Sequence, residues 1–221
     1  MTERAQLAAQ RAAQAHIWGH ILPDRWQAVV QHAGKTVLDV GCANGVYVAK
    51  LLENGYQAQG IDLLPYAEWA HLPGHFQLAD ATQLPYPDES FDTVISFETL
   101  EHVPEPARAL AELHRVARKT LVLSVPNCQT PADLRDSGFT YHHWVDRTHV
   151  NFFTLETLQT IIEAAGFRVQ VAKPINPILP AVPLLTSFGM PLRPPRGVAR
   201  LLRRISPRRY YMSLLIVAGK I

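Results

Sequence analysis

The sequence predicts an α/β fold, in which helices cover both faces of an open and mostly parallel sheet. Two observations support this prediction. Short apolar runs recur along the chain, and segments with helical spacing of apolar residues lie between them. Strands that alternate with helices are joined by crossovers, and a crossover makes neighbouring strands parallel. The 221 residues, of which 48% are hydrophobic and 18% charged, suit one sizeable globular domain spanning residues 1–221.

Seven segments are expected to form strands. The first, Lys35–Val40, is a short apolar run that ends at Gly41, which is the pattern of a buried parallel strand. A second run ends at Asp62, and residues 92–97 and 120–125 are expected to form the fourth and fifth strands. The full set of expected strands is 35–40, 57–62, 75–78, 92–97, 120–125, 167–173 and 210–218.

Four segments are expected to be helical. Residues 3–18 are rich in alanine, the best helix former, and Pro23 is expected to end this region. Residues 45–53 are followed by Asn54-Gly55, a typical helix stop, and residues 104–117 begin with prolines suited to a first turn. Thr154 is expected to cap the fourth helix, which is closed by Gly166 and has one apolar face made of Leu155, Leu158, Ile161, Ile162 and Ala165.

Three segments lie outside this alternating pattern. Residues 1–30 are expected to form an N-terminal helical lid, and residues 127–153 an insertion on the substrate side. Residues 174–209 form a further insertion with eight of the seventeen prolines, seven arginines and no acidic residue. Because the whole chain carries +2 and this segment +7, the remaining residues carry −5. The basic charge is therefore local, which counts against broad nucleic-acid binding.

The composition also bears on compartment. The N-terminus has no continuous apolar core of a secretory signal, and no stretch approaches the length of a membrane span. The two cysteines, Cys42 and Cys128, suit a reducing compartment better than a disulfide framework. A cytoplasmic location is therefore expected.

The strongest local motif is a glycine loop after the first strand. Gly41 and Gly45 bracket the loop, and Asp62 lies 21 residues after Gly41, where a carboxylate can accept hydrogen bonds from ribose hydroxyls. The dinucleotide pattern G-x-G-x-x-G is absent, because Ala43 and Val46 stand where it requires glycine. A Cβ at position 43 disfavours close approach of a pyrophosphate, so the loop favours a ligand without one.

Together with later motifs, this loop resembles that of the class I S-adenosylmethionine-dependent methyltransferases. The similarity is carried by Val37–Gly45, Asp62, Asp80-Ala81, and the strand-four signature in 84–92 and 94–103. It implies a Rossmann-like sheet of seven strands, the last antiparallel, and S-adenosylmethionine as cofactor. It also implies that Asp62 binds the ribose and Asp80 the adenine amino group. The expected cofactor-binding residues are Asp39, Gly41, Cys42, Gly45, Asp62, Leu63, Asp80, Ala81 and Phe97.

The sequence departs from the family pattern at two places. Ala43 replaces a frequent glycine, and the usual Gly-Gly turn before the fifth strand is missing at residues 117–119.

Two clusters are candidates for the chemistry of methyl transfer. One is the Glu98-x-x-Glu101-His102 motif after the fourth strand, and the other contains His143 and His149. A base or a metal promotes transfer to an oxygen by removing its proton. The expected catalytic residues are His149, His143, Glu101 and His102.

The E-x-x-E-H spacing also resembles the metal-binding motif of ubiquinone-pathway O-methyltransferases and of small-RNA 2′-O-methyltransferases. The resemblance implies a divalent cation, Mg²⁺ or similar, held by Glu98, Glu101, His102 and His149. The alternative is that these side chains only shape the pocket.

The function expected from these motifs is O-methylation of a hydroxyl on a small molecule such as a sugar, a phenol or a secondary metabolite. Three alternatives stay open: an RNA-end 2′-O-methyltransferase, a non-catalytic S-adenosylmethionine-binding protein, and a dehydrogenase. The basic segment has three interpretations: recognition of an anionic substrate group, peripheral membrane contact through residues 193–209, or a solvated or dimer-forming insertion. The oligomeric state, monomer or homodimer, is left open.

Overall fold

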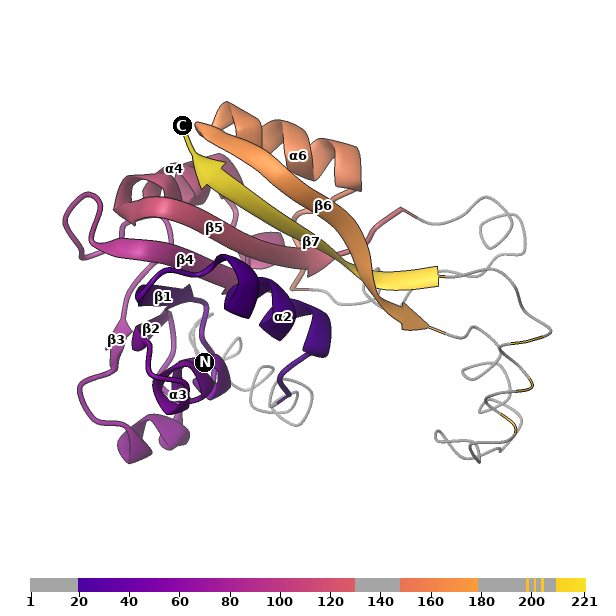
Figure 1. The fold of residues 1–221 in the computed structure, drawn as a ribbon. Coiled ribbons are helices and arrows are strands. Elements are labelled where there is room, and N and C mark those ends of the chain that lie inside the picture. Colours follow the sequence, from indigo (N-terminus) through magenta and orange to yellow (C-terminus); the bar gives the residue numbers. More distant parts are fainter. Residues whose placement is uncertain (1–19, 130–147, 179–197, 199–200, 202–203, 205–209) are drawn as a thin grey trace.

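The computed structural model describes residues 20–129, 148–178, 198, 201, 204 and 210–221. A seven-stranded sheet in the order β3-β2-β1-β4-β5-β7-β6 forms its centre (Figure 1). Strands β1 to β5 are parallel, and β7 runs antiparallel to both β5 and β6, which confirms the predicted sheet. The strands are β1 (Thr36–Val40), β2 (Gln57–Asp62), β3 (Phe76–Leu78), β4 (Phe91–Phe97), β5 (Ala117–Pro126), β6 (Phe167–Ile178) and β7 (Tyr210–Lys220).

The strand order reverses at β1. From β1 the chain adds β2 and β3 on one side, and β4 then pairs with β1 on the other side. In open parallel sheets, ligands bind in the crevice that such a reversal leaves at the carboxyl ends of the strands. The loops after β1, β2 and β4 are therefore the place to look for a site.

Helices cover both faces of the sheet. They are α2 (Pro23–His32), α3 (Val46–Glu53), α4 (Pro106–Val116) and α6 (Leu155–Ala164), with short 3₁₀ helices η1 (Ala67–His71) and η2 (Leu100–His102). Alternate residues of a strand point to opposite faces. Leu38 of β1 accordingly packs in a core with Leu110 of α4 and Leu158 of α6. Its neighbour Val37 packs in a second core with Val29 of α2 and Val48 of α3.

Helix α2 was not predicted from the sequence, because Pro23 was expected only to end the N-terminal helical region. Pro23 instead begins a helix, because the first turn needs no amide donor from it and suits its fixed φ. Val29 is fully buried, and α2 contacts β5 and β7. Residues 23–30 of the predicted lid thus belong to the layer that covers the sheet, and residues 1–19 lie outside the described residues.

The strands at the C-terminal end of the sheet are longer than predicted. β6 continues through Pro174 and Pro177 to Ile178, so residues 174–178, which were predicted to open the insertion, belong to this strand. Proline is tolerated there because β6 is an edge strand and bonds to β7 on one side only. No turn separates α4 from β5, because Ala117 both caps α4 and begins β5. This direct connection explains why the usual Gly-Gly turn is missing.

Other predicted boundaries are confirmed. Thr154 caps α6 and accepts a hydrogen bond from the Thr157 amide at 3.2 Å.

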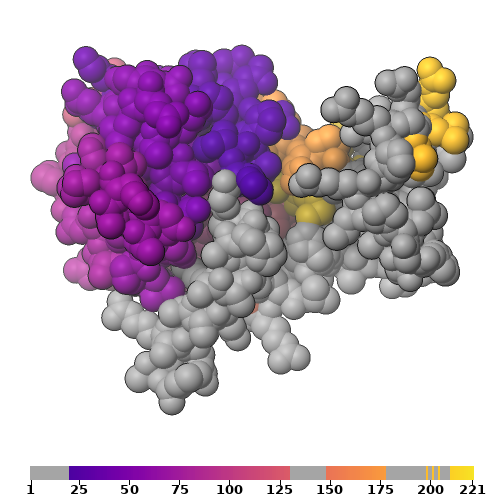
Figure 2. Space-filling view, turned by 90° about the horizontal axis from the view of Figure 1, so that it is seen from below, coloured from indigo at the N-terminus to yellow at the C-terminus, as the bar shows by residue number. Residues whose placement is uncertain are grey.

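In the space-filling view from below, the N-terminal half of the described chain, coloured indigo to purple, forms one continuous body. Strand β6, in orange, lies to one side of it (Figure 2). Within the part of the chain described, no helix has the length and apolar character needed to cross a membrane.

Candidate cofactor-binding and active site

The glycine loop between β1 and α3 has a backbone that only glycine fits at two positions. Gly41 and Gly45 have φ angles of +79° and +80°. A Cβ added at Gly41 would overlap Thr99, and one added at Gly45 would overlap the ring of Phe76. The Gly41 and Cys42 amides both donate to the Ile61 carbonyl at 2.9 Å, which ties the loop to the end of β2. The loop is therefore held at the carboxyl edge of the sheet with a defined shape.

Asp62, at the end of β2, is held by the backbone around it. Its Oδ2 accepts a hydrogen bond from the Ala43 amide at 3.0 Å, and its Oδ1 accepts one from the Leu64 amide at 3.2 Å. The residue is only 4% exposed. An ionised carboxylate has about four lone-pair sites, so an oxygen of this kind can accept more than one hydrogen bond.

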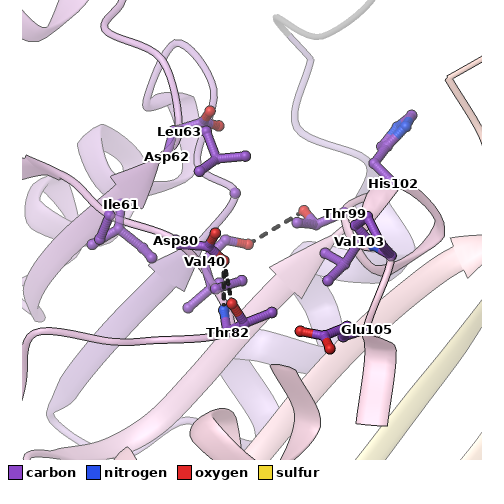
Figure 3. Close-up of a pocket in the computed structure, with 14 residues that line it drawn as sticks. Val40, Ile61, Asp62, Leu63, Asp80, Thr82, Thr99, His102, Val103 and Glu105 are labelled. Carbon is purple, nitrogen blue, oxygen red and sulfur yellow. Dashed lines mark hydrogen bonds between the residues drawn. The ribbon is translucent and has the colours of Figure 1, made fainter. Parts of the chain in front are cut away.

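A cavity of about 250 Å³ opens beside this loop. Figure 3 shows Asp62, Leu63 and Asp80 on one side of it and Thr99, His102 and Val103 on the other. Its wall is made by Val40, Gly41, Ile61, Asp62, Leu63, Ala79, Asp80, Ala81, Thr82, Thr99, His102, Val103, Pro104 and Glu105. The cavity thus joins the ends of β1, β2 and β3 to the turn that follows β4.

Asp80 is oriented within the cavity wall by its own turn. Its Oδ1 accepts hydrogen bonds from the Thr82 amide at 2.8 Å and the Thr82 hydroxyl at 2.7 Å. An Asp carboxylate fixed in this way by a nearby backbone amide presents its second oxygen in a defined direction.

Nine residues were predicted to bind the cofactor, and five of them line this cavity: Gly41, Asp62, Leu63, Asp80 and Ala81. The other four, Asp39, Cys42, Gly45 and Phe97, do not. Phe97 packs against Tyr47, with ring centroids 4.7 Å apart, and below the guanidinium of Arg25.

Asp39, in β1, and Cys42, in the glycine loop, are both buried. Burial, and then the neighbouring charge of Asp62, raises the pKa of Asp39 to about 8. Burial also raises the pKa of the Cys42 thiol, with further contributions from Asp39 and Asp62. The Cys42 thiol therefore stays protonated, which supports a packing role for it and not a nucleophilic one.

A second group of side chains lies after β4. Ligand atoms of Glu101, His102 and His149 all lie within 4.8 Å of one another. The His102 and His149 rings meet edge to face with centroids 4.8 Å apart, and the His102 Nε2 lies 3.9 Å from the Glu101 Oε1. Glu101 is 1% exposed, while His102 also borders the cavity. The structure thus brings together three of the side chains predicted to be catalytic.

Asn151 fastens the segment that carries His149 to the turn that carries Glu101. Its side-chain amide donates to the Leu100 carbonyl at 3.1 Å and the Val103 carbonyl at 2.6 Å. The backbone amides of Val150 and Asn151 both donate to the Glu101 carbonyl, at 2.9 and 3.1 Å. The position of His149 therefore depends on these bonds.

His102 has a defined orientation. Its Nδ1 lies 3.1 Å from the Thr148 carbonyl oxygen and 3.1 Å from the Thr148 hydroxyl. When Nδ1 donates to the carbonyl, Nε2 is the unprotonated nitrogen, which is the form that accepts a proton or binds a metal.

Glu98, predicted as a metal ligand, is not part of this group in the described residues. It has a left-handed φ of +52°, and its carboxylate forms an ion pair with Arg25 and accepts a hydrogen bond from Ser124 at 3.2 Å. The structure therefore does not bring Glu98 together with the other three residues that were predicted as metal ligands. His143, the remaining predicted catalytic residue, lies outside the described residues.

Sequence reasoning missed Arg25, Thr99 and Asn151. Each of them binds a segment that is remote in sequence. Arg25 forms an ion pair with Glu98, and the Thr99 hydroxyl donates to the Val40 carbonyl at 3.3 Å. The Asn151 side-chain amide donates to the turn of η2. No local pattern marks such residues, because their partners are set by the fold.

Comparison with known proteins places the chain in a family. Residues 10–171 match the protein family described as a methyltransferase domain. The chain belongs to this family. It is 32% identical over 130 residues to an uncharacterized methyltransferase of Mycobacterium sp. (strain KMS), which covers 55% of the chain and 52% of that protein.

Two further similarities are informative. The chain is 29% identical over 141 residues to the malonyl-[acyl-carrier protein] O-methyltransferase of Serratia marcescens, covering 62% of the chain and 54% of that protein. It shares its fold with the 1,6-didemethyltoxoflavin-N1-methyltransferase of Burkholderia thailandensis, with a TM-score of 0.67 at 18% identity, covering 98% and 86% of the two chains. The chain spans about half the length of the curated relatives it matches.

Proposed function

We propose that this chain is an S-adenosylmethionine-dependent methyltransferase whose donor occupies the cavity between the glycine loop, Asp62 and Asp80. The observation that carries the proposal is that these three elements, from the ends of three strands, line one cavity and are each fixed by hydrogen bonds. Asp62 would accept from the ribose hydroxyls and the second oxygen of Asp80 from the adenine amino group. The Burkholderia thailandensis protein of the same fold binds S-adenosylhomocysteine, which supports this reading.

The acceptor would lie at the other end of the cavity, near His102. Methyl transfer from a sulfonium is an in-line displacement, so positioning of the two reactants supplies much of the rate. A hydroxyl acceptor must also lose a proton, and His102 or His149 can take it, with Glu101 stabilising the resulting imidazolium. We therefore propose O-methylation of a small molecule, a class of reaction that the name of the Serratia marcescens relative also carries.

The same three side chains fit a divalent cation. Two imidazoles and one carboxylate within 4.8 Å make a three-ligand set that leaves coordination positions for an acceptor. A bound cation would acidify the acceptor hydroxyl. Because Glu98 is paired with Arg25, the set loses one of its two predicted carboxylates and keeps both imidazoles, which favours Fe²⁺ or Zn²⁺ over Mg²⁺.

The test is transfer of a labelled methyl group from S-adenosylmethionine to separate pools of sugars, phenols, quinones and short RNAs, each with and without EDTA. We expect label in a small-molecule pool. Label only in RNA, with salt-dependent retention of RNA by the protein, would replace this proposal with the RNA-end alternative. A rate unchanged by EDTA would leave the His and Glu side chains as bases and remove the cation from the proposal.

A further inference from the structure

Ala43 has an unusual backbone for a residue with a Cβ. It stands at the centre of the glycine loop, where the family frequently has glycine, and its φ is +46°. The left-handed region is costly for L-residues other than glycine. Something in the structure must therefore hold the loop in this conformation.

Both backbone polar groups of Ala43 are bound by side chains. Its amide donates to the Asp62 carboxylate at 3.0 Å, and its carbonyl accepts a hydrogen bond from the Trp69 indole Nε1 at 2.8 Å. These two bonds come from different elements, the end of β2 and the 3₁₀ helix η1. Together they fix the peptide groups on both sides of the Ala43 Cα.

Trp69 is itself held in place by an aromatic stack. Its ring lies parallel to that of Phe76, with centroids 5.0 Å apart and an interplanar angle of 7°. The same Phe76 ring lies against Gly45, where it leaves no room for a Cβ. Trp69 and Phe76, which we call the aromatic clamp, thus contact the loop at its centre and at its end.

The aromatic clamp is connected to the proposed donor site through Ala43, which is hydrogen-bonded both to Trp69 and to Asp62. The Asp62 carboxylate is oriented by two amides, those of Ala43 and Leu64. If Ala43 left the left-handed region, Asp62 would lose one of these two bonds and with it part of its orientation toward the cavity.

We propose that Trp69 is a positioning residue for the donor, because its indole N–H holds Ala43 in the conformation that aims Asp62 into the cavity. This inference rests on the proposed function, since it assumes that the donor binds at Asp62. It predicts an effect on donor binding and none on the acceptor or on the chemical step.

The substitution Trp69→Phe tests the proposal, because it keeps a ring to stack on Phe76 and removes the N–H. The dissociation constant of S-adenosylhomocysteine, measured by calorimetry, should rise about 10-fold, and so should the KM for S-adenosylmethionine. The kcat at saturating donor and the KM for the acceptor should not change. Trp26→Phe, on helix α2, removes an indole elsewhere and should leave all four values unchanged.

Ala43→Gly provides the decisive second variant. Glycine adopts positive φ without the cost of a Cβ, so the double variant W69F/A43G should regain most of the affinity that W69F loses. Wild-type affinity in W69F, or equal weakness in W69F and W69F/A43G, would overturn the role of Trp69. If W69F does not fold, regained folding and donor binding in the double variant supports the proposal, and a failure of both variants overturns it. Absence of S-adenosylhomocysteine binding by the wild-type protein would instead overturn the proposed function itself.

Discussion

The two ends of the cavity are built in different ways. The donor end is made by residues 41–82, in which short loops follow three neighbouring strands and backbone amides fix the key carboxylate. The acceptor end brings residues 98–102 together with residues 148–151, and side chains such as Asn151 hold the two segments in contact. The first end is local in sequence, and the second depends on long-range packing.

This difference suggests how each end responds to change. A substitution at the donor end should act on donor binding alone, since the backbone amides and the aromatic clamp that anchor it all lie within residues 41–82. A substitution around the acceptor end should act on chemistry or on the stability of the fold, since its anchors also hold distant segments together.

The largest effect is expected from Arg25→Met, which breaks the ion pair that joins α2 to Glu98. Both side chains are largely buried, with 9% and 15% exposed. Removing one partner of a buried pair leaves an uncompensated charge and typically costs about 3–5 kcal/mol. We expect a loss of this size in the free energy of unfolding, measured with urea.

Lys50→Met is the matched control, because it removes the partner of Glu53 in an exposed pair at 3.3 Å on α3. Such pairs contribute about 0–1 kcal/mol. Equal losses in the two variants would show that the Arg25 pair does not hold the acceptor end together.

Asp62→Asn should weaken S-adenosylhomocysteine binding by about 10²- to 10³-fold. The side-chain amide cannot reproduce the two hydrogen bonds that the charged carboxylate would accept from the ribose hydroxyls, each of which is typically worth about 1.5–3 kcal/mol. Calorimetry on the variant gives the number, and Glu53→Gln, an exposed acid on α3, is the control. Unchanged affinity in Asp62→Asn would show that the donor does not bind at the end of β2.

Glu101→Gln should lower kcat about 10²-fold at saturating donor, the range expected when a proton-transfer group is disabled. The dissociation constant of S-adenosylhomocysteine should stay within about twofold of the wild-type value, since Glu101 does not line the cavity. Single-turnover rates with a labelled donor measure the first quantity. A parallel loss of donor affinity would mean that the two ends of the cavity act as one unit.

The same contrast explains which predictions from sequence succeeded. Gly41, Asp62 and Asp80 could be placed because each lies at or just after the end of a predicted strand, and parallel strands end at one edge of the sheet. Glu98 was grouped with Glu101 and His102 by spacing. Its left-handed φ turns it toward Arg25 instead, and no periodicity in the sequence reports that.

The fold shows the same pattern. The strands were predicted well because a buried parallel strand is a continuous apolar run. The start of α2 at Pro23 was missed because proline serves equally as a helix stop and as a first helical residue. The continuation of β6 was not predicted because Pro174 and Pro177 argue against a strand unless it lies at the edge of a sheet. Only the strand order shows that β6 is an edge strand.

The smallest effect concerns the pH dependence of stability, through Asp39. Its pKa is about 8 in the folded protein because of burial and Asp62, against about 4 when unfolded. Between these values only the folded state holds the proton, so the free energy of unfolding falls as pH rises through this window. Between pH 6 and 7 the fall due to this one group is at most about 1.4 kcal/mol.

Asp39→Asn should remove this part of the slope. Urea unfolding at pH 6 and pH 7 for both proteins measures the difference. An identical slope in the variant would mean that Asp39 is ionised in the folded protein across this range.

The central claim is that the cavity beside the glycine loop binds S-adenosylmethionine and no dinucleotide. Calorimetric titration of the wild-type protein with S-adenosylhomocysteine, and in parallel with NADH, tests it most directly. We predict saturable binding of one S-adenosylhomocysteine per chain, displaced by S-adenosylmethionine, and no binding of NADH. No heat with S-adenosylhomocysteine, or saturable binding of NADH at the same site, would contradict the claim.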